Sequence, residues 1–114
     1  MKAFIRVMKA LSDPNRIKIM KMLMEKELCV CEITAILGLA QSTVSRHLKI
    51  LEDAELVHSW RDGAWVNYRI TDKSESPYAT ELIFQLKDWL NDDSEVREVL
   101  AKLPYVDRER INAA

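Results

Sequence analysis

Two cysteines, Cys29 and Cys31, are the side chains best suited to chemistry in this sequence. They lie too close together along the chain to cross-link distant elements, which favours free thiols in a reducing compartment. Thiolates are soft ligands, so a pair at this spacing could bind a soft, thiophilic ion. The alternative is that Cys31 is a small core residue and that Cys29 has no role, because free cysteine is often buried.

Polar side chains between Gln41 and Lys49 form a second candidate site. Val44, Leu48 and Leu51 recur at helical spacing and predict the buried face of a helix, which leaves the polar residues outside. In the major groove of DNA, glutamine can pair with adenine and arginine with guanine, while hydroxyls and cations hold phosphates. The candidate DNA-binding residues are Gln41, Ser42, Thr43, Ser45, Arg46, His47, Lys49, Arg61 and Arg69. The alternative is a solvated helix face without a ligand.

Four helices are expected to position these two sites. Apolar spacing predicts a first helix over residues 4–11, and Asp13 and Pro14 begin the second with a capping carboxylate and a proline at the first helical position. A short third helix ends at Gly38, because glycine readily takes the left-handed conformation at a helix end. The fourth helix begins at Gln41. A short helix, a glycine turn and a polar-faced helix are typical of a helix-turn-helix.

A β-hairpin is expected after Glu55, where the period of the apolar residues changes to two. Residues 56–61 and 64–70 are rich in β-branched and aromatic side chains, and they flank Asp62-Gly63, a strong signal for a hairpin turn. Alternation along the second strand predicts a core face and an outer face: Val66, Tyr68 and Ile70 inward, and Trp65, Asn67 and Arg69 outward.

Two more helices are expected in the last third of the chain. The first runs from Pro77 to Asn91 and carries a long apolar stripe, which is more apolar surface than a small monomer needs. The second stops at Pro104. We therefore assign residues 1–103 to one DNA-binding and dimerisation domain and expect residues 104–114 to be a tail, frayed from residue 105.

Length, composition and charge restrict the class of protein. A chain of 114 residues with 48% hydrophobic residues is long enough for one folded domain with a real core. No apolar stretch reaches the ~18–20 residues that cross a bilayer, so we expect a cytoplasmic protein without a membrane partner. Residues 1–71 carry a net charge of +3 and residues 72–114 a net charge of −4, which places any nucleic-acid surface in the first part.

Enzymatic motifs are absent from the sequence. It contains no glycine-rich phosphate loop, no nucleophile elbow and no zinc-protease motif, so we do not expect an enzyme. The two histidines, His47 and His58, have no evident partner set for catalysis or metal binding. We expect structural roles or a phosphate contact for them.

Three blocks, residues 27–33, 41–51 and 63–70, occur in the order found in a known family. Over about residues 4–90 the chain resembles the ArsR/SmtB family of bacterial metal-responsive repressors. This resemblance implies an α+β fold that is mostly α: a winged helix-turn-helix with a two-stranded hairpin as the wing. It also implies a homodimer joined through the first helix and the 77–91 helix, which binds palindromic double-stranded operator DNA and leaves it when a metal or metalloid binds.

The Glu-Leu-Cys-Val-Cys-Glu block at residues 27–32 is similar to that of arsenic-sensing members, in which the thiols lie at the start of the helix before the recognition helix. The resemblance therefore implies that Cys29 and Cys31 bind trivalent arsenic, or antimony, as inducer. A helix start lowers the pKa of a thiol, which supports such a site. Residues two apart on a regular helix point about 200° apart, so both sulfurs could bind one ion only if the helix start is loose or distorts. Ion binding would then pull the cysteines together and shift the short helix against the recognition helix.

The chain departs from its relatives at Thr34, where three-cysteine members have their third thiol. Coordination is therefore expected to be two thiols plus an unknown ligand. Cadmium- and lead-sensing relatives add N-terminal cysteines, and none precedes Cys29; zinc-, nickel- or cobalt-sensing relatives use histidine on the dimer helix, and residues 77–91 contain none. Two other functions stay open: a redox- or persulfide-responsive repressor that uses the same cysteines, and a winged helix that binds a protein partner instead of DNA.

Overall fold

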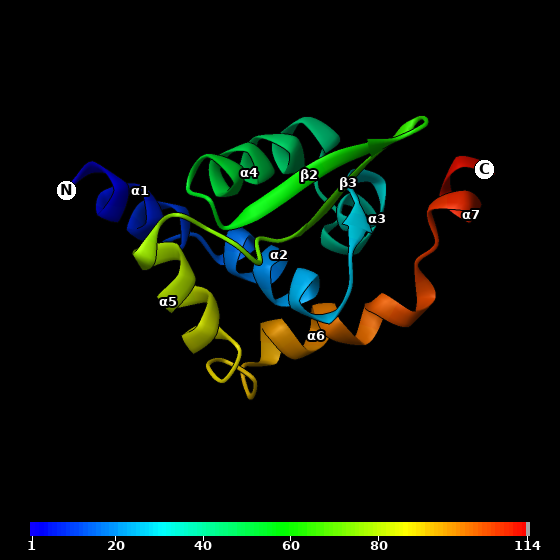
Figure 1. The fold of residues 1–114 in the computed structure, drawn as a ribbon. Coiled ribbons are helices and arrows are strands. Elements are labelled where there is room, and N and C mark those ends of the chain that lie inside the picture. Colours follow the sequence, from blue (N-terminus) through cyan, green and yellow to red (C-terminus); the bar gives the residue numbers. More distant parts are fainter. Residues whose placement is uncertain (114) are drawn as a thin grey trace.

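The computed structural model, which describes residues 1–113, has two helices, a short strand, two more helices, a β-hairpin and then further helices, and its three strands form one antiparallel sheet (Figure 1). The helices are α1 (Lys2–Ala10), α2 (Pro14–Glu25), α3 (Val30–Leu37), α4 (Gln41–Asp53), α5 (Pro77–Leu86), α6 (Ser94–Lys102) and α7 (Arg108–Ala113). The strands are β1 (Leu28–Cys29), β2 (Val57–Asp62) and β3 (Trp65–Ile70), and a 3₁₀ helix, η1 (Leu103–Tyr105), precedes α7. Helices α3 and α4 form the helix-turn-helix and the β2–β3 hairpin forms the wing, so the predicted fold is confirmed. No helix in this described part is long and apolar enough to cross a lipid bilayer.

The start of α2 and the end of α3 follow local signals in the sequence. The Asp13 carboxylate caps α2, because its Oδ1 accepts hydrogen bonds from the backbone amides of Asn15 (2.8 Å) and Arg16 (3.2 Å). Gly38 ends α3 with a φ of +68°, a conformation that costs most other residues energy. The predicted signals at both positions are confirmed.

The sheet contains one strand that the sequence did not predict. Its strand order is β1-β3-β2, and in β1 Leu28 lies opposite Tyr68 while Cys29 lies opposite Asn67. The hairpin turn itself consists of Gly63 and Ala64, because Asp62 still pairs with Trp65 in the ladder. The predicted turn is therefore shifted by one residue. Strand β1 makes the residues just before α3 part of the same sheet as the wing.

Helix α2 lies at the centre of the fold and is buried on more than one side. It packs against α4, α6 and β3, and Ile19, Met20 and Met22 are fully buried. The apolar stripe of α4, predicted from spacing, is buried in the same core. Because α2 is surrounded, side chains on several of its sides are buried, and one of these is a lysine.

The buried lysine, Lys21, accounts for the end of α5. Its Nζ donates to the carbonyl oxygens of Leu86 (2.8 Å) and Trp89 (2.8 Å) and to Oδ1 of Asn91 (2.6 Å). Burial lowers the pKa of Lys21, while the carboxylates of two acidic neighbours oppose this shift. The predicted extension of the helix to Asn91 is wrong, because the chain turns after Leu86 to present these acceptors to the ammonium group, and Leu90 takes a φ of +63°.

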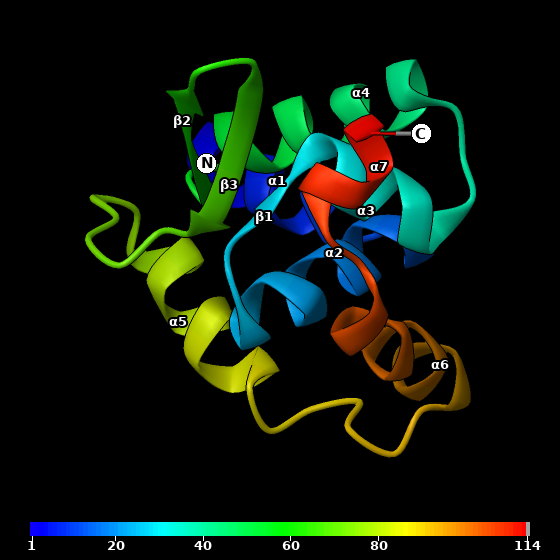
Figure 2. The same ribbon diagram turned by 90° about the vertical axis from the view of Figure 1, so that its right-hand side faces the viewer.

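Residues 104–113 do not fray as the sequence suggested. They form η1 and α7, and α7 packs against α3 (Figure 2). Arg108 holds α7 to the wing: its Nη2 donates to Oδ2 of Asp62 (2.9 Å), its Nη1 donates to Oδ1 of Asn67 (3.3 Å), and its guanidinium lies 4.1 Å from the ring centroid of Trp65. These contacts order the segment against the sheet.

The packing of α7 also changes the expected outer face of β3. Asn67 was expected to point into solvent, but it is buried because Arg108 covers that face of the strand. On the other face, Tyr68 is buried as predicted, and Val66 and Ile70 are half-buried. Both faces of the wing strand are therefore covered at its centre.

Candidate functional site

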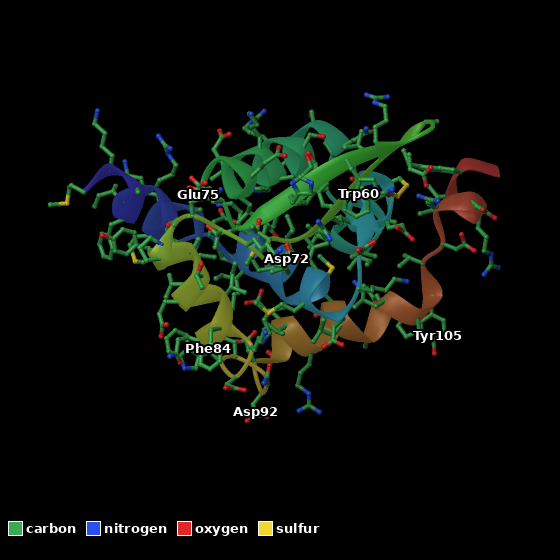
Figure 3. The ribbon with its side chains drawn as sticks, viewed as in Figure 1. Trp60, Asp72, Glu75, Phe84, Asp92 and Tyr105 are labelled. Atoms are coloured by element: carbon green, nitrogen blue, oxygen red, sulfur yellow. A yellow bond between two sulfur atoms is a disulfide. The ribbon has the colours of Figure 1, made fainter. Side chains whose placement is uncertain are left out.

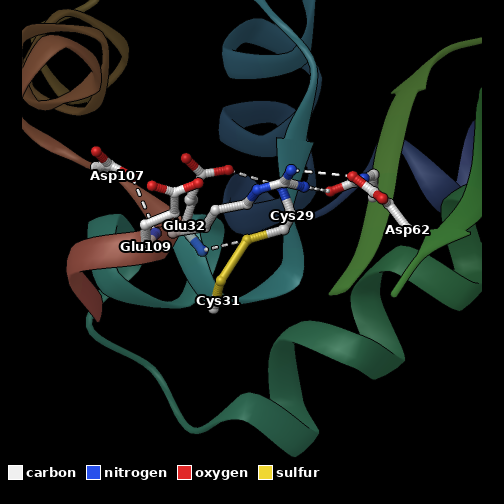
Figure 4. The surroundings of a disulfide bond; sticks show 8 residues. Cys29, Cys31, Glu32, Asp62, Asp107 and Glu109 are labelled. Atoms are coloured by element: carbon white, nitrogen blue, oxygen red, sulfur yellow. Dashed lines mark hydrogen bonds and ion pairs between the residues drawn. A yellow bond between two sulfur atoms is a disulfide. The ribbon is translucent and has the colours of Figure 1, made fainter. Parts of the chain in front are cut away.

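The two cysteines lie side by side because only one of them is helical. Cys29 ends β1 and has an extended backbone, with φ −84° and ψ 163°, while Cys31 is the second residue of α3. Their Cα atoms are 5.4 Å apart and their sulfurs are joined in a disulfide (Figure 4). The sequence predicted free thiols and a helix start that is loose or distorts, so that both sulfurs can bind one ion. The expectation of free thiols is wrong, because the sulfurs are bonded. The sulfurs meet because Cys29 lies in the extended cap before the regular helix begins.

Cys29 is also the N-cap of α3. Its Sγ accepts a hydrogen bond from the backbone amide of Glu32 (3.4 Å), and Oε1 of Glu32 accepts one from the amide of Cys29 (2.9 Å), which is a reciprocal capping box. Glu32 itself is buried. The sulfur of Cys29 thus sits at the positive end of the helix dipole, where a thiolate is stabilised once the pair is reduced.

Access to the sulfur pair is from the side of Cys31. Cys29 is only 1% exposed, whereas Cys31 is half-buried. One turn further along α3, the hydroxyl of Thr34 is buried and has no hydrogen-bond partner among the described residues. Residues three apart in a helix share a face, so this hydroxyl follows Cys31 on the same side of α3. Within residues 1–113 no group of three or more His, Cys, Asp or Glu side chains is placed to hold a metal ion.

The sulfur pair is connected to both parts of the winged helix-turn-helix. Through β1, the backbone of Cys29 pairs with Asn67 in β3 of the wing. Through α3, Cys31 belongs to the helix that packs directly on α4. A movement of Cys29 would therefore be passed to the wing through β1, and a movement of Cys31 would be passed to α4 through α3.

Helix α4 presents most of its candidate DNA-binding side chains to solvent. Val44, Leu48 and Leu51 are fully buried, as predicted. The exposed residues on the other side are Gln41, Ser42, Ser45, Arg46 and Lys49, and Thr43 is half-buried. The ammonium of Lys49 lies 3.2 Å from Oδ1 of Asp53, and this contact raises the pKa of Lys49.

His47 is held by a partner that the sequence did not reveal. Its Nδ1 lies 3.1 Å from Nη1 of Arg16. A guanidinium can only donate, so Nδ1 must accept and the ring proton must be on Nε2. Arg16 also donates to the carbonyl oxygens of Ala10 (2.7 Å) and Lys9 (3.2 Å) at the end of α1. His47 thus takes a structural role between α4 and α1, while His58 is exposed on β2.

The two arginines of the wing differ in their exposure to solvent and in their contacts with the protein. Arg61 is exposed near the end of the hairpin. Arg69 is half-buried, and its guanidinium lies 5.8 Å from the ring centroid of Trp60, which is labelled on the wing in Figure 3. Arg61 is therefore the better placed of the two for a contact beyond the protein.

Apolar side chains remain exposed on α1 and α5. Phe4 and Tyr78 pack edge to face with their ring centroids 5.3 Å apart, yet each is about 40% exposed. Phe84, near the end of α5, is 61% exposed (Figure 3). This is the surface that the sequence assigned to dimerisation, and exposed aromatic groups of this size are typical of protein interfaces.

Sequence reasoning missed Glu32 and Arg108, which contact residues of the sulfur site and the wing, and Lys21, which fixes the end of α5. Glu32 could have been found, because a carboxylate three residues after a helix cap is a known capping signal. No local signal marks Arg108 or Lys21, since their partners lie 41 or more residues away along the chain.

Comparisons with known proteins agree with this geometry. The family model described as "Bacterial regulatory protein, arsR family" matches residues 13–59. The arsenical resistance operon repressor of Bacillus subtilis is 39% identical over 74 residues, which are 64% of this chain and 70% of that protein. The cadmium resistance regulator CadC of Listeria innocua is 46% identical over 63 residues, 54% of this chain and 53% of its own. Among solved structures, HlyU from Vibrio cholerae matches with a TM-score of 0.64 and 29% identity, over 76% of this chain and 90% of that one.

Proposed function

Because the chain belongs to the ArsR family of bacterial regulatory proteins, we propose that it is a transcriptional repressor whose inducer is trivalent arsenic, or antimony, bound by Cys29 and Cys31. One observation carries the choice of site: the two sulfurs lie together at the N-terminus of α3. Strand β1, which contains Cys29, pairs with the wing strand β3, and α3, which contains Cys31, packs on α4. Soft sulfur ligands suit a soft, thiophilic ion.

Arsenic is favoured over other ions by the ligands that the chain offers. A relative named for arsenical resistance and one named for cadmium resistance are both similar to this chain, so similarity alone does not choose. No cysteine precedes Cys29, and residues 77–91 contain no histidine. Two thiolates completed by hydroxide or an external thiol suit a three-coordinate ion better than a four-coordinate one.

The capping box supplies a mechanism for release from DNA. A sulfur that binds an ion gives up lone-pair density, so Cys29 would weaken its hydrogen bond with the Glu32 amide. The start of α3 and strand β1 would then shift together. Because β1 pairs with the wing and α3 packs on α4, the shift would change the spacing of the two DNA-contacting elements.

The DNA-contacting residues proposed are those of α4 and the wing. Gln41 and Arg46 would contact bases, Ser42, Thr43, Ser45 and Lys49 would contact phosphates or neighbouring bases, and Arg61 would reach the adjacent backbone. The exposed aromatic surface of α1 and α5 would join two copies. Two α4 helices about one helical turn of DNA apart would then read a palindromic operator.

The proposal is tested by fluorescence anisotropy of a labelled duplex with the reduced protein. Arsenite should release the protein from DNA, and zinc, cadmium and peroxide should be far less effective. Release by cadmium or zinc at lower concentration than arsenite would overturn the choice of inducer. No duplex binding even at low salt would instead favour a winged helix that binds a protein partner, because phosphate contacts always strengthen as salt falls.

A second candidate function is favoured by the disulfide between Cys29 and Cys31. A thiol-responsive repressor would be switched when peroxide takes two electrons and two protons from the thiols, forming the disulfide and two waters. In the same titration, release by peroxide with recovery on addition of a dithiol reductant, and no response to arsenite, would support this function.

Thr34→Cys is expected to make the chain more sensitive to arsenite. The substitution places a third thiol one turn after Cys31, and it removes a hydroxyl that has no hydrogen-bond partner among the described residues, so the fold loses little. A third thiolate should lower the arsenite concentration for half-release by about 10- to 100-fold. Thr34→Ser, which adds no soft ligand, is the matched control, and equal sensitivity of the two variants would contradict the prediction.

A further inference from the structure

Helix α1 carries an unpaired row of cations on its outer side. Lys2, Arg6 and Lys9 recur at helical spacing, and the helix contains no carboxylate. Val7 and Ala10 are buried on the inner side, which fixes the row outward. Within the described part of the chain, none of the three cations takes part in an ion pair. Three uncompensated charges on one short helix are a strong local source of positive potential.

These cations line a groove next to the proposed recognition helix. The groove has a volume of about 640 Å³ and lies between α1 and the C-terminal half of α4. The side chains of Ile5 and Ile50 give it an apolar lining, and the carboxylate of Asp53 in its wall is already paired with Lys49. Cations above apolar groups fit a sugar-phosphate backbone, because deoxyribose offers apolar surface and each phosphate offers a charge.

The groove is held in a fixed position relative to α4. Arg16 donates to two carbonyl oxygens at the end of α1 and contacts Nδ1 of His47 on α4, with distances of 2.7, 3.2 and 3.1 Å. A guanidinium that connects two helices in this way keeps the cations of α1 in register with the exposed face of α4. Preorganised charges bind a rigid polyanion at a lower entropic cost than mobile ones.

The opposite side of the molecule has the reverse charge. In Figure 1, α1, α4 and the wing lie along the upper side, while α5 and α6 lie along the lower side. Residues 77–102 contain six carboxylates and three cations. A duplex would therefore be attracted to the α1–α4–wing side and repelled from the α5–α6 side.

We propose that Lys2, Arg6 and Lys9 bind DNA phosphates next to the segment that α4 reads, so that α1 is a third DNA-contacting element. The proposal rests on the DNA binding proposed above. These contacts are independent of base sequence, and each neutralised phosphate adds about 0.9 to the slope of log affinity against log salt. The α1 row therefore supplies general affinity, while α4 supplies selection of sequence.

The test compares salt slopes for a fluorescein-labelled duplex of mixed sequence, about three helical turns long, with reduced protein. The double variant Lys2→Gln/Arg6→Gln is expected to lower the slope by about 1.8 and to weaken binding at every salt concentration. The control is Lys87→Gln/Arg97→Gln, which removes two exposed cations from the α5–α6 side and should leave the slope unchanged. Arg46→Gln serves as a marker for the α4 contact, and thermal melting shows that each variant is folded.

The outcomes separate this proposal from the function on which it rests. If Arg46→Gln weakens binding while the α1 double variant keeps the wild-type slope, the proposal is overturned and DNA binding by α4 stands. If the wild-type protein binds no duplex at low salt, both fail. If the α1 variant loses affinity only because it no longer dimerises, as sedimentation would show, the three cations act in the contact between copies and not on DNA phosphates, and the proposal is again overturned.

Discussion

Cys29→Ser is expected to abolish release of the protein from DNA by arsenite while leaving DNA binding intact. A hydroxyl is a poor ligand for a soft ion, so one thiolate of the pair is lost. Even an outer-shell partner of a metal ligand is typically worth 10- to 100-fold, so loss of a ligand should raise the half-release concentration by at least about 100-fold. The measurement is an arsenite titration followed by fluorescence anisotropy.

Because of the capping box, Cys29→Ser should remove the thiol ligand without disturbing the start of α3. Serine is among the best helix N-caps, and with Glu32 three residues later it reproduces the standard reciprocal box, so the start of α3 should keep its hydrogen bonds. Cys29→Ala is the matched control, because it removes both the ligand and the cap, and it should also cost about 1 kcal/mol of stability. An unchanged arsenite response in Cys29→Ser would show that the sulfur of Cys29 is not a ligand.

Lys21→Met is expected to lower the free energy of unfolding by about 2–3 kcal/mol. The ammonium of Lys21 donates to two carbonyl oxygens and one amide oxygen in the segment between α5 and α6. Hydrogen bonds to a charged group contribute about 1.5–3 kcal/mol each to stability. Removal of the ammonium also removes the desolvation cost of burying its charge, which offsets part of the loss. Urea unfolding followed by circular dichroism measures the change.

The pH dependence of this loss has a defined sign. The pKa of Lys21 is lower in the folded chain than in the unfolded one, so the unfolded chain binds more protons in the alkaline range. The Lys21 contribution to stability therefore grows as pH rises toward 10, and the difference between wild type and Lys21→Met should grow with it. Lys73→Met, at an exposed lysine, is the control. A variant as stable as the wild type would show that methionine packing replaces all three hydrogen bonds.

The parts of the fold that were predictable depend on neighbours close in sequence. The cap at Asp13, the glycine at position 38 and the apolar stripe of α4 act within one or two turns, and each is found where it was expected. The wing follows from alternation and a glycine turn, although the turn is one residue later than predicted. Residue type and spacing singled out Cys29 and Cys31, but they predicted free thiols and not the bond between them.

The parts that were missed depend on distant partners. Strand β1 has only two residues and exists because β3 pairs with it. The end of α5 depends on Lys21, 65 residues away from Leu86. The order of the C-terminal segment depends on Arg108, whose partners lie in the wing. Periodicity cannot report such contacts, because it reads only the neighbours of each residue along the chain.

The residues of the sulfur site lie close together in the sequence, so few substitutions are needed to alter the response of the protein to an ion. Cys29, Cys31 and position 34 lie within six consecutive residues at the edge of α3, and none of them belongs to the apolar cluster that joins the helices. A few substitutions there could therefore strengthen or remove the response to a thiophilic ion while the DNA-contacting elements keep their packing. If Cys29 and Cys31 bind the inducer as proposed, the sensitivity of the protein to a thiophilic ion can be altered within this short segment, without redesign of the helices and the wing.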